Sequence, residues 1–206
     1  MLGTTLELRV NTVTNSWERV SLKLVRRSPT VSINLSKVVL IAGRKRSGKD
    51  TFAKCLKHSY AEAGQSVAIL SFADPLKDIM SITLGMTHAQ LDTAKNSNPT
   101  YRGYLQRFGT EAMKKYFGDA VWVDIMRKRI ADHSSTDVIL IPDFRFPIEA
   151  LEGALTVKVT RSSQKPQTDP HASETALESY LFNKVISNDG TIEDLQDLSN
   201  NLIKDT

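Results

Sequence analysis

The sequence predicts an α/β protein in which a five-stranded parallel sheet carries helices on both faces. Short apolar runs of three to five residues alternate with stretches whose apolar residues recur at helical spacing. A glycine-containing loop joins the first run to a helix, and charged residues directly follow the later runs. Alternating strands and helices imply parallel strands, so these polar residues should meet at the carboxyl ends of the strands.

The first apolar run, Val38–Ile41, predicts a buried strand, and the loop after it has the pattern G-x-x-x-x-G-K. Strand, glycine loop and helix in this order are the context of a phosphate-binding loop. Backbone N–H groups close around an anion there, and Lys49 should reach the outer phosphates. The loop residues expected to contact a nucleotide are Gly43, Arg46, Ser47, Gly48, Lys49, Asp50 and Thr51. This motif places the chain in the three-layer P-loop NTPase fold class.

One position departs from the usual loop. A hydroxyl residue normally follows the lysine and holds Mg²⁺, but Asp50 stands there, with Thr51 one place later. A carboxylate is a good Mg²⁺ ligand, and the basic run Arg44-Lys45-Arg46 would offset its charge beside phosphates. Alternatively, Asp50 caps the helix and interacts with the helix dipole. Three basic residues in one anion loop suggest that a second phosphorylated ligand binds nearby.

Composition fits one well-buried core. The chain has 206 residues, 40% of them hydrophobic and 24% charged. A formal charge of +4 is mild and partly concentrated in the loop, so no nucleic-acid partner is expected. No apolar run approaches a membrane span, and the start does not have the pattern of a secretory signal. Cys55 is the only cysteine and is interpreted as core filling, which fits a reduced, cytoplasmic setting.

Residues 1–36 are interpreted as an N-terminal extension, and residues 37–206 as the domain that contains the phosphate-binding loop. Apolar residues alternate with polar ones around Leu6–Val10 and Val20–Leu24, with Thr14-Asn15-Ser16 as a turn between them. A period of two predicts a β-hairpin. A flexible leader or an upstream start of the reading frame is the alternative, and the extension indicates no function.

The remaining elements follow in order. After the first helix, Val67–Ser71 is the second strand, and Pro75 stands in the first turn of the next helix. Residues 86–100 are polar and end in a loop-like stretch. Two helices are predicted at 101–116 and 120–133, strands at 138–141, 155–159 and 184–186, a helix starting at Asp169-Pro170, and a last helix capped by Thr191.

The strand ends carry a consistent set of charges. The second strand is followed by Asp74 and Lys77, and the third by Asp143, Arg145 and Glu149. An acidic residue after an apolar strand is the second Mg²⁺-handling element of phosphate-loop enzymes, so Asp50 and Asp143 are the candidate metal ligands. Arg145 could clamp a phosphate with two hydrogen bonds. As alternatives, Asp143 caps a helix, and Arg145 and Glu149 form an ion pair on one helix face.

A helical insertion at about 74–134 separates the second and third strands. In a kinase, an acceptor would be held there, by arginines for phosphate, amides for base edges and an aromatic ring for stacking. Its candidate residues are Leu76, Arg102, Gln106, Gly109, Thr110 and Trp122, with Arg107 and Glu111 alongside. Trp122 as core packing is the alternative. The polar segment at about 161–170 is interpreted as a lid, with Arg161 approaching the transferring phosphate. His171 is interpreted as a helix-start or packing residue rather than a base.

Several pieces of the chain together match one known family, over residues 38 to about 195. They are Arg44–Thr51, Phe72–Lys77, Leu105-Gln106 with Gly109-Thr110-Glu111, Val121-Trp122-Val123, Asp143–Pro147 with Glu149, His171–Glu174 and Asn188–Thr191. On these motifs the sequence resembles the bacteriophage-type deoxynucleoside monophosphate kinases. The most specific are Gly-Lys-Asp-Thr and Asp-x-Arg-Phe-Pro.

The resemblance implies transfer of the γ-phosphoryl group of ATP, with Mg²⁺, to a deoxynucleoside 5′-monophosphate, in a host cytoplasm if the gene is viral. It implies ATP contacts from Gly48 to Thr51 and Arg161 as the lid arginine. It further implies monophosphate contacts from Lys45, Lys77, Gly109, Thr110, Trp122, Asp143, Arg145 and Glu149. Lys49, Asp50, Asp143, Arg145 and Arg161 would form the catalytic set. A homodimer is left open.

Other functions remain alternatives. A kinase for phosphomevalonate or dephospho-coenzyme A would use a similar loop. A nucleotide switch of GTPase type would need Asn-Lys-x-Asp, whereas Asn183-Lys184-Val185-Ile186 lacks the aspartate. A binding protein without activity is disfavoured because Lys49, Asp50 and Asp143 are all present.

Overall fold

The structure is a computed structural model that describes residues 5–11, 17–23, 35–163 and 175–204. The chain divides into two compact units, Met1–Ser32 and Ile33–Thr206. In the first unit, β1 (Thr5–Asn11) pairs antiparallel with β2 (Trp17–Lys23), and Leu8 lies opposite Val20. This pairing is the hairpin that the alternating pattern predicts. Its predicted turn, Thr14-Asn15-Ser16, lies outside the described residues.

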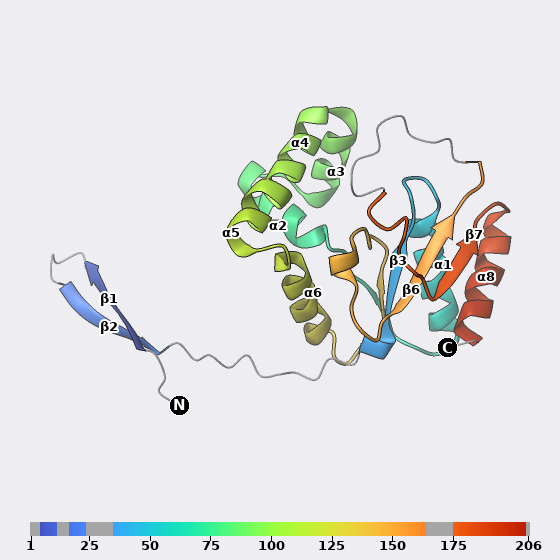
Figure 1. Ribbon diagram of the computed structural model, residues 1–206, viewed down its shortest axis with the longest axis horizontal. Helices are drawn as coiled ribbons and strands as arrows, with labels where there is room; N and C mark the ends of the chain where they lie inside the picture. Colours follow the sequence, from blue (N-terminus) through green and yellow to red (C-terminus); the bar gives the residue numbers. More distant parts are fainter. Residues whose placement is uncertain (1–4, 12–16, 24–34, 164–174, 205–206) are drawn as a thin grey trace. The chain divides into compact units, whose positions relative to one another are not determined.

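The second unit is built on a sheet of five parallel strands in the order β4-β5-β3-β6-β7; Figure 1 labels β3, β6 and β7. These strands are β3 (Val38–Ala42), β4 (Val67–Ile69), β5 (Val138–Ile141), β6 (Leu155–Thr160) and β7 (Lys184–Ser187). Every residue of β3 and β5 is buried, which fits their unbroken apolar runs. The predicted fold class is therefore confirmed. The central strand, β3, delivers the glycine loop between its neighbours β5 and β6.

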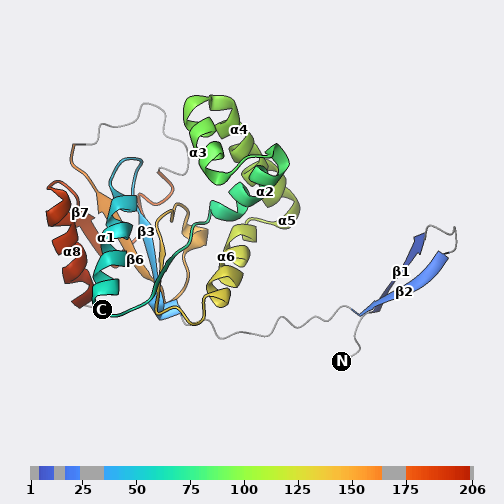
Figure 2. The ribbon, with the colours of Figure 1, turned by 180° about the vertical axis from the view of Figure 1, so that it is seen from behind.

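Alternate residues of β3 face two separate cores. Val39 and Ile41 pack with α1 (Lys49–Glu62) and α8 (Ile192–Lys204), the helices that cover one face of the sheet. Cys55, on α1, is part of this core, as the sequence suggests, and burial raises the pKa of its thiol. Val38 and Leu40 pack on the other face with α6 (Val121–Asp132) (Figure 2). Among the described residues, no helix is both long and apolar enough to cross a membrane.

The insertion between β4 and β5 is helical throughout most of its length (Figure 1). It comprises α2 (Asp74–Leu84), α3 (His88–Ser97), α4 (Pro99–Arg107), the π-helical turn η2 (Phe108–Lys114), α5 (Lys115–Phe117) and α6. The π-helical turn lies at Gly109-Thr110-Glu111, and such turns often occur at functional sites. Two short 3-10 turns are η1 (Leu35–Lys37) and η3 (Pro147–Glu149).

Helix α3 corrects the interpretation of residues 86–100 as ending in a loop. Thr87 caps this helix: its hydroxyl accepts from the N–H of Gln90, whose side chain accepts from the N–H of Thr87. Leu91 is fully buried and anchors the helix. A polar composition concealed the helix, although the Thr-x-x-Gln spacing is a capping signal. The helix predicted to start at Asp169-Pro170 lies outside the described residues, as does His171.

Candidate functional site

The glycine loop closes tightly between β3 and α1. The N–H of Ser47 donates to the carbonyl of Arg44 at 3.0 Å, and Arg46 adopts a positive φ of 67°. Gly48 begins α1 with φ 91°, in the left-handed region that favours glycine. The hydroxyl of Ser47 is fully buried and has no hydrogen-bond partner. The loop therefore forms a tight turn that ends at the N-terminus of α1, and anion binding by its backbone stays a prediction.

Asn188 holds the glycine loop through a side-chain hydrogen bond, a role that the sequence analysis missed. Its side-chain N–H donates to the carbonyl of Ser47 at 2.8 Å, and its backbone N–H donates to Thr160. A Cβ on Gly48 would stand 2.0 Å from the Asn188 side-chain nitrogen. Asn188 directly follows β7, so its place at a strand end was the available signal. The loop conformation thus depends on a residue that lies 141 positions after Ser47 in the chain.

The side chains of Lys49 and Asp50 lie in different environments. The Lys49 side chain is only 11% exposed, whereas that of Asp50 is 73% exposed, and their charged atoms are 3.4 Å apart. Asp50 stands in the first turn of α1, but α1 has no side-chain hydrogen bond at its cap. The place of Asp50 in the first turn fits the alternative in which its charge interacts with the helix dipole, and metal binding stays a prediction. The carboxylate of Asp50 faces solvent beside the loop, while the ammonium of Lys49 is held inside.

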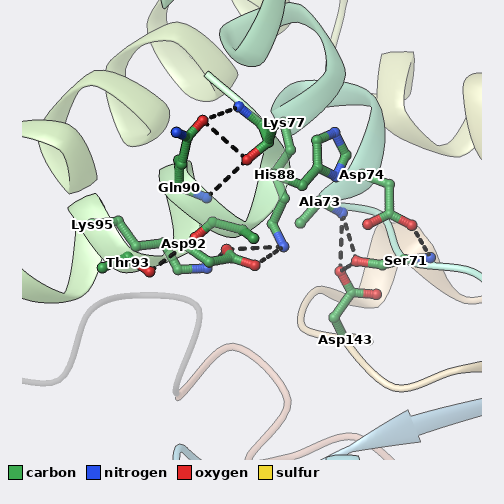
Figure 3. Close-up of polar contacts among 12 residues, drawn as sticks. Ser71, Ala73, Asp74, Lys77, His88, Gln90, Asp92, Thr93, Lys95 and Asp143 are labelled. Carbon is green, nitrogen blue, oxygen red and sulfur yellow. Dashed lines mark hydrogen bonds and ion pairs between the residues drawn. The ribbon is translucent and has the colours of Figure 1, made fainter.

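Asp143 links the ends of β5 and β4 (Figure 3). Its Oδ2 accepts from the Ser71 hydroxyl at 2.6 Å and the Ala73 N–H at 3.0 Å, and its Oδ1 accepts from the Phe72 N–H at 3.0 Å. Three hydrogen bonds leave a carboxylate about one further acceptor position. Asp143 therefore orders the β4–α2 connection, and Ser71 is a second residue that the sequence analysis missed.

Asp74 lies beside this connection. Its Oδ2 accepts from the backbone N–H of Ser71 at 3.1 Å, and an Arg129 guanidinium nitrogen is 4.0 Å away. Burial raises the pKa of Asp74, Arg129 opposes that rise, and the nearby Asp143 carboxylate adds to it. The predicted grouping of Asp74 with Asp143 at adjacent strand ends is present in the structure.

Glu149 turns back onto the segment after β5. Its Oε2 accepts from the N–H groups of Arg145 at 2.7 Å and Phe146 at 3.0 Å. It is 8% exposed, and burial is the main reason that its pKa rises to about 7; the two N–H donors and Lys114 oppose the rise, and Asp143 adds to it. Glu149 thus shapes the backbone around Arg145, a contact distinct from the side-chain ion pair considered from the sequence.

We expect Glu149→Gln to change how stability depends on pH. Because the folded pKa is raised, the folded state binds a proton that the unfolded state releases, so this group's contribution is complete below about pH 4.5 and lost as pH rises through about 7. The glutamine keeps an oxygen acceptor but does not titrate. Urea unfolding without nucleotide or Mg²⁺ should show a variant that is more stable by about 1 kcal/mol or less near pH 5 and by up to about 3 kcal/mol at pH 8.

Glu152→Gln serves as the control for this prediction, because that side chain is exposed in the same segment. Its stability difference from the unchanged protein should stay constant between pH 5 and pH 8. A constant difference for Glu149→Gln as well would show that Glu149 is ionised throughout.

Three candidates for substrate contact in the insertion pack against one another. The indole N–H of Trp122 donates to the carbonyl of Gly109 at 3.1 Å, and Trp122 is only 9% exposed. A Cβ on Gly109 would stand 3.0 Å from a methyl group of Leu76. Trp122 is thus part of the core, as the alternative interpretation has it, and it fixes the π-helical turn. A further contact of Trp122 or Leu76 with an acceptor stays a prediction.

Polar candidates of the insertion gather on α4 and η2. Gln106 and Thr110 line a pocket of about 480 Å³ together with Arg107 and Glu111. Arg102 is exposed on α4 outside this lining. The structure therefore brings the amide and hydroxyl candidates together but not the arginine of residue 102.

A second pocket of about 240 Å³ lies beside the phosphate loop. Gly43, Arg44 and Arg161 line it with the aromatic rings of Phe144 and Phe182. The Arg44 guanidinium donates to Glu178 at 2.6 Å, another contact without a sequence signal. Arg161, at the start of the expected lid, thus shares a pocket with the loop. Residues 164–170 of that lid lie outside the described residues.

Lys77 points from the first turns of α2 toward α3 (Figure 3). Its ammonium lies 3.1 Å from both oxygens of Asp92, and the Lys95 ammonium lies 2.5 Å from Oδ1 of the same carboxylate. Burial would raise the pKa of Asp92, but the hydrogen bonds from Lys95 and Lys77 outweigh it and hold the pKa low. Asp92 and Lys95 were missed because their segment was not expected to be helical.

Comparison with known proteins identifies a family that matches this chain. Residues 86–198, more than half of the chain, match the profile of a family described as deoxynucleotide monophosphate kinase. No match was found among curated proteins. Among solved structures, a cysteine-to-alanine mutant of the Mycobacterium tuberculosis APS kinase CysC is similar at 16% identity, with 82% of this chain and 96% of that chain covered and a TM-score of 0.41. The fold assignment above rests on the strands themselves.

Proposed function

Because this chain belongs to the deoxynucleotide monophosphate kinase family, a family of phosphotransferases, we propose that it transfers the γ-phosphoryl group of ATP, with Mg²⁺, to a deoxynucleoside 5′-monophosphate. The observation that carries the proposal is the pairing of β3 with β5. This pairing sets the loop that holds Lys49 beside the segment of Asp143 and Arg145. A donor-phosphate loop and an acidic-basic segment at neighbouring strand ends are the parts that phosphoryl transfer uses.

The proposed mechanism asks for little covalent chemistry from the protein. The attacking oxygen of a monophosphate is already ionised, so no strong general base is needed. Lys49 would stabilise negative charge on the transferring group from inside the loop, and the loop N–H groups would bind the donor phosphates. Arg145 and Lys45 would hold the acceptor, with Arg161 approaching from the lid. Catalysis would come from in-line positioning and charge neutralisation.

The residues present fit a Mg²⁺ ion bound largely through substrate phosphates. Such sites use one or two carboxylates and retain several waters. Asp50 offers an exposed carboxylate beside the loop, and Asp143 keeps about one acceptor position. In the described part of the chain, no group of three or more acidic, histidine or cysteine side chains could hold a metal ion. The ion would neutralise phosphate charge during transfer.

We expect Asp50→Ala to reduce Mg²⁺-dependent turnover by about tenfold or more, while stability changes by about 0.3–1 kcal/mol, the usual size of a helix-dipole interaction. The exposed carboxylate makes no capping hydrogen bond, so its removal should hardly affect folding. Turnover against Mg²⁺ concentration and urea unfolding provide the two measurements. Thr51→Val tests whether the neighbouring hydroxyl shares the role. If the loss of stability in Asp50→Ala is large enough to explain its loss of turnover, Asp50 would instead have a structural role.

The proposed reaction is tested by ADP formation from ATP with a panel of acceptors. The panel contains dAMP, dCMP, dGMP, dTMP, phosphomevalonate and dephospho-coenzyme A. At least one deoxynucleoside monophosphate should stimulate ADP formation well above the rate without acceptor. Stimulation by phosphomevalonate or dephospho-coenzyme A alone would assign a different small-acceptor kinase, and ADP formation independent of any acceptor would assign an NTPase.

A further inference from the structure

Two lysines from neighbouring helices enclose one carboxylate in the insertion. Lys77 on α2 contacts both oxygens of Asp92, and Lys95 on α3 contacts Oδ1 (Figure 3). The two lysines and Asp92 carry two positive charges and one negative charge, and the Asp74 carboxylate is also close enough to Lys77 to interact with its charge. The lysine side chains are 19% and 28% exposed, but that of Asp92 is 40% exposed. The carboxylate is therefore the most accessible member.

The arrangement has the chemistry of an anion site that a side chain already fills. Two ammonium groups converging on one oxygen would also suit an oxygen of a phosphate. A phosphate monoester carries close to two negative charges at neutral pH, against one for a carboxylate. It would therefore neutralise both lysines, which Asp92 alone does not.

The site also adjoins the connection that the strand ends build. The N–H of Lys77 donates to the carbonyl of Ala73, and the N–H of Ala73 donates to Asp143. One helical turn thus joins the lysine to the segment held by the carboxyl end of β5 (Figure 3). An anion bound by Lys77 would lie against the same β4–α2 connection that Asp143 orders.

Lys77 is already expected to contact the monophosphate; we propose that Lys95 joins it in receiving the 5′-phosphate and that Asp92 occupies their site in the free enzyme as an internal competitor. This inference rests on the proposed function, because it takes the acceptor to be a nucleoside monophosphate. Binding of the acceptor breaks the pairs of Asp92 with the two lysines. Asp92 thereby sets the acceptor affinity and leaves donor binding unaffected.

The test is calorimetric binding of a deoxynucleoside monophosphate in the absence of ATP, at low salt. Asp92→Asn should tighten binding by about three- to tenfold, the size expected for one charge at a part-exposed site. Lys95→Met should weaken it by a similar factor. The matching deoxynucleoside without phosphate should bind Asp92→Asn and the unchanged protein equally. ATP affinity should be the same in both.

A second polar contact between the same helices supplies a matched control. His88 on α3 contacts Asp78 on α2 at 2.8 Å, in a pair that includes neither Lys77 nor Lys95. Asp78→Asn removes a carboxylate and one α2–α3 contact, but it should leave acceptor binding unchanged. If Asp78→Asn and Asp92→Asn act alike, loosening of α3 explains both and the proposal is wrong. It is also wrong if Asp92→Asn weakens binding as Lys95→Met does, since Asp92 would then position the lysines.

Inorganic phosphate separates this proposal from the proposed function. If no deoxynucleoside monophosphate binds the unchanged protein, the proposed acceptor is wrong, yet Asp92→Asn should still bind inorganic phosphate more tightly. If Asp92→Asn binds neither anion more tightly, the competitor role of Asp92 is overturned whatever the acceptor is.

Discussion

Replacing Lys49 with methionine is expected to lower kcat by about 10²- to 10³-fold, the loss typical of removing one preorganised donor at a reacting group. The Lys49 side chain is 11% exposed inside the phosphate loop, so its charge acts where water screens little. Methionine has a similar length and no charge. Single-turnover rates with saturating ATP and acceptor measure the chemical step directly.

The free energy of unfolding of Lys49→Met should stay close to that of the unchanged protein. The partner of Lys49 is an exposed aspartate, and pairs with one exposed member contribute little, so the free energy of unfolding should change by about 1 kcal/mol or less. Lys57→Met is the control, because Lys57 is exposed on the same helix. Near-normal turnover of Lys49→Met would remove this lysine from the catalytic set.

Replacing Gly48 with alanine is expected to destabilise the second unit by about 2–5 kcal/mol, from left-handed strain and loss of a buried hydrogen bond. Gly48 has φ 91°, and the new Cβ would stand 2.0 Å from the Asn188 nitrogen that donates to Ser47. The clash pushes Asn188 away, so the loop loses its support from β7. Urea unfolding and ATP binding measure the two consequences.

Gly64→Ala is the control that separates backbone strain from the clash with Asn188. Gly64 has φ 78° near the other end of α1, and a Cβ there would meet nothing within 4 Å. Gly64→Ala should therefore cost about 1–2 kcal/mol, from backbone strain alone, and leave ATP binding intact. The double variant Gly48→Ala/Asn188→Ala should lose less stability than the sum of the losses in the two single variants, because Asn188→Ala removes the clash that Gly48→Ala creates. Strict additivity would show that Asn188 does not support the loop.

The sequence predicted the parts that depend on local pattern. Buried strands such as Val38–Ala42 are unbroken apolar runs, and the glycine loop follows a fixed spacing, so fold class and loop could both be inferred. Strand-end order also placed Asp143 near Asp74, because neighbouring parallel strands end at the same edge of a sheet. Helix α3 was missed because polar composition outweighed the capping signal of Thr87 and Gln90.

Other features could not be read from the sequence because they depend on tertiary contacts. Asn188 reaches Ser47 only when β7 takes its place beside β6. The pairing of Lys77 with Asp92 needs α3 to fold back onto α2. The burial of Trp122 against Gly109 depends on how η2 packs on α6. Each of these contacts joins residues whose spacing in the chain carries no periodic signal.

The fate of the γ-phosphoryl group tests the central claim most directly. ATP labelled in its γ-phosphate is incubated with the full chain, Mg²⁺ and one deoxynucleoside monophosphate, and the products are separated. The proposed function predicts one labelled deoxynucleoside diphosphate for each ADP formed, and Lys49→Met should slow the formation of both by about 10²- to 10³-fold. Label found only in inorganic phosphate, at a rate unaffected by the acceptor, would contradict it.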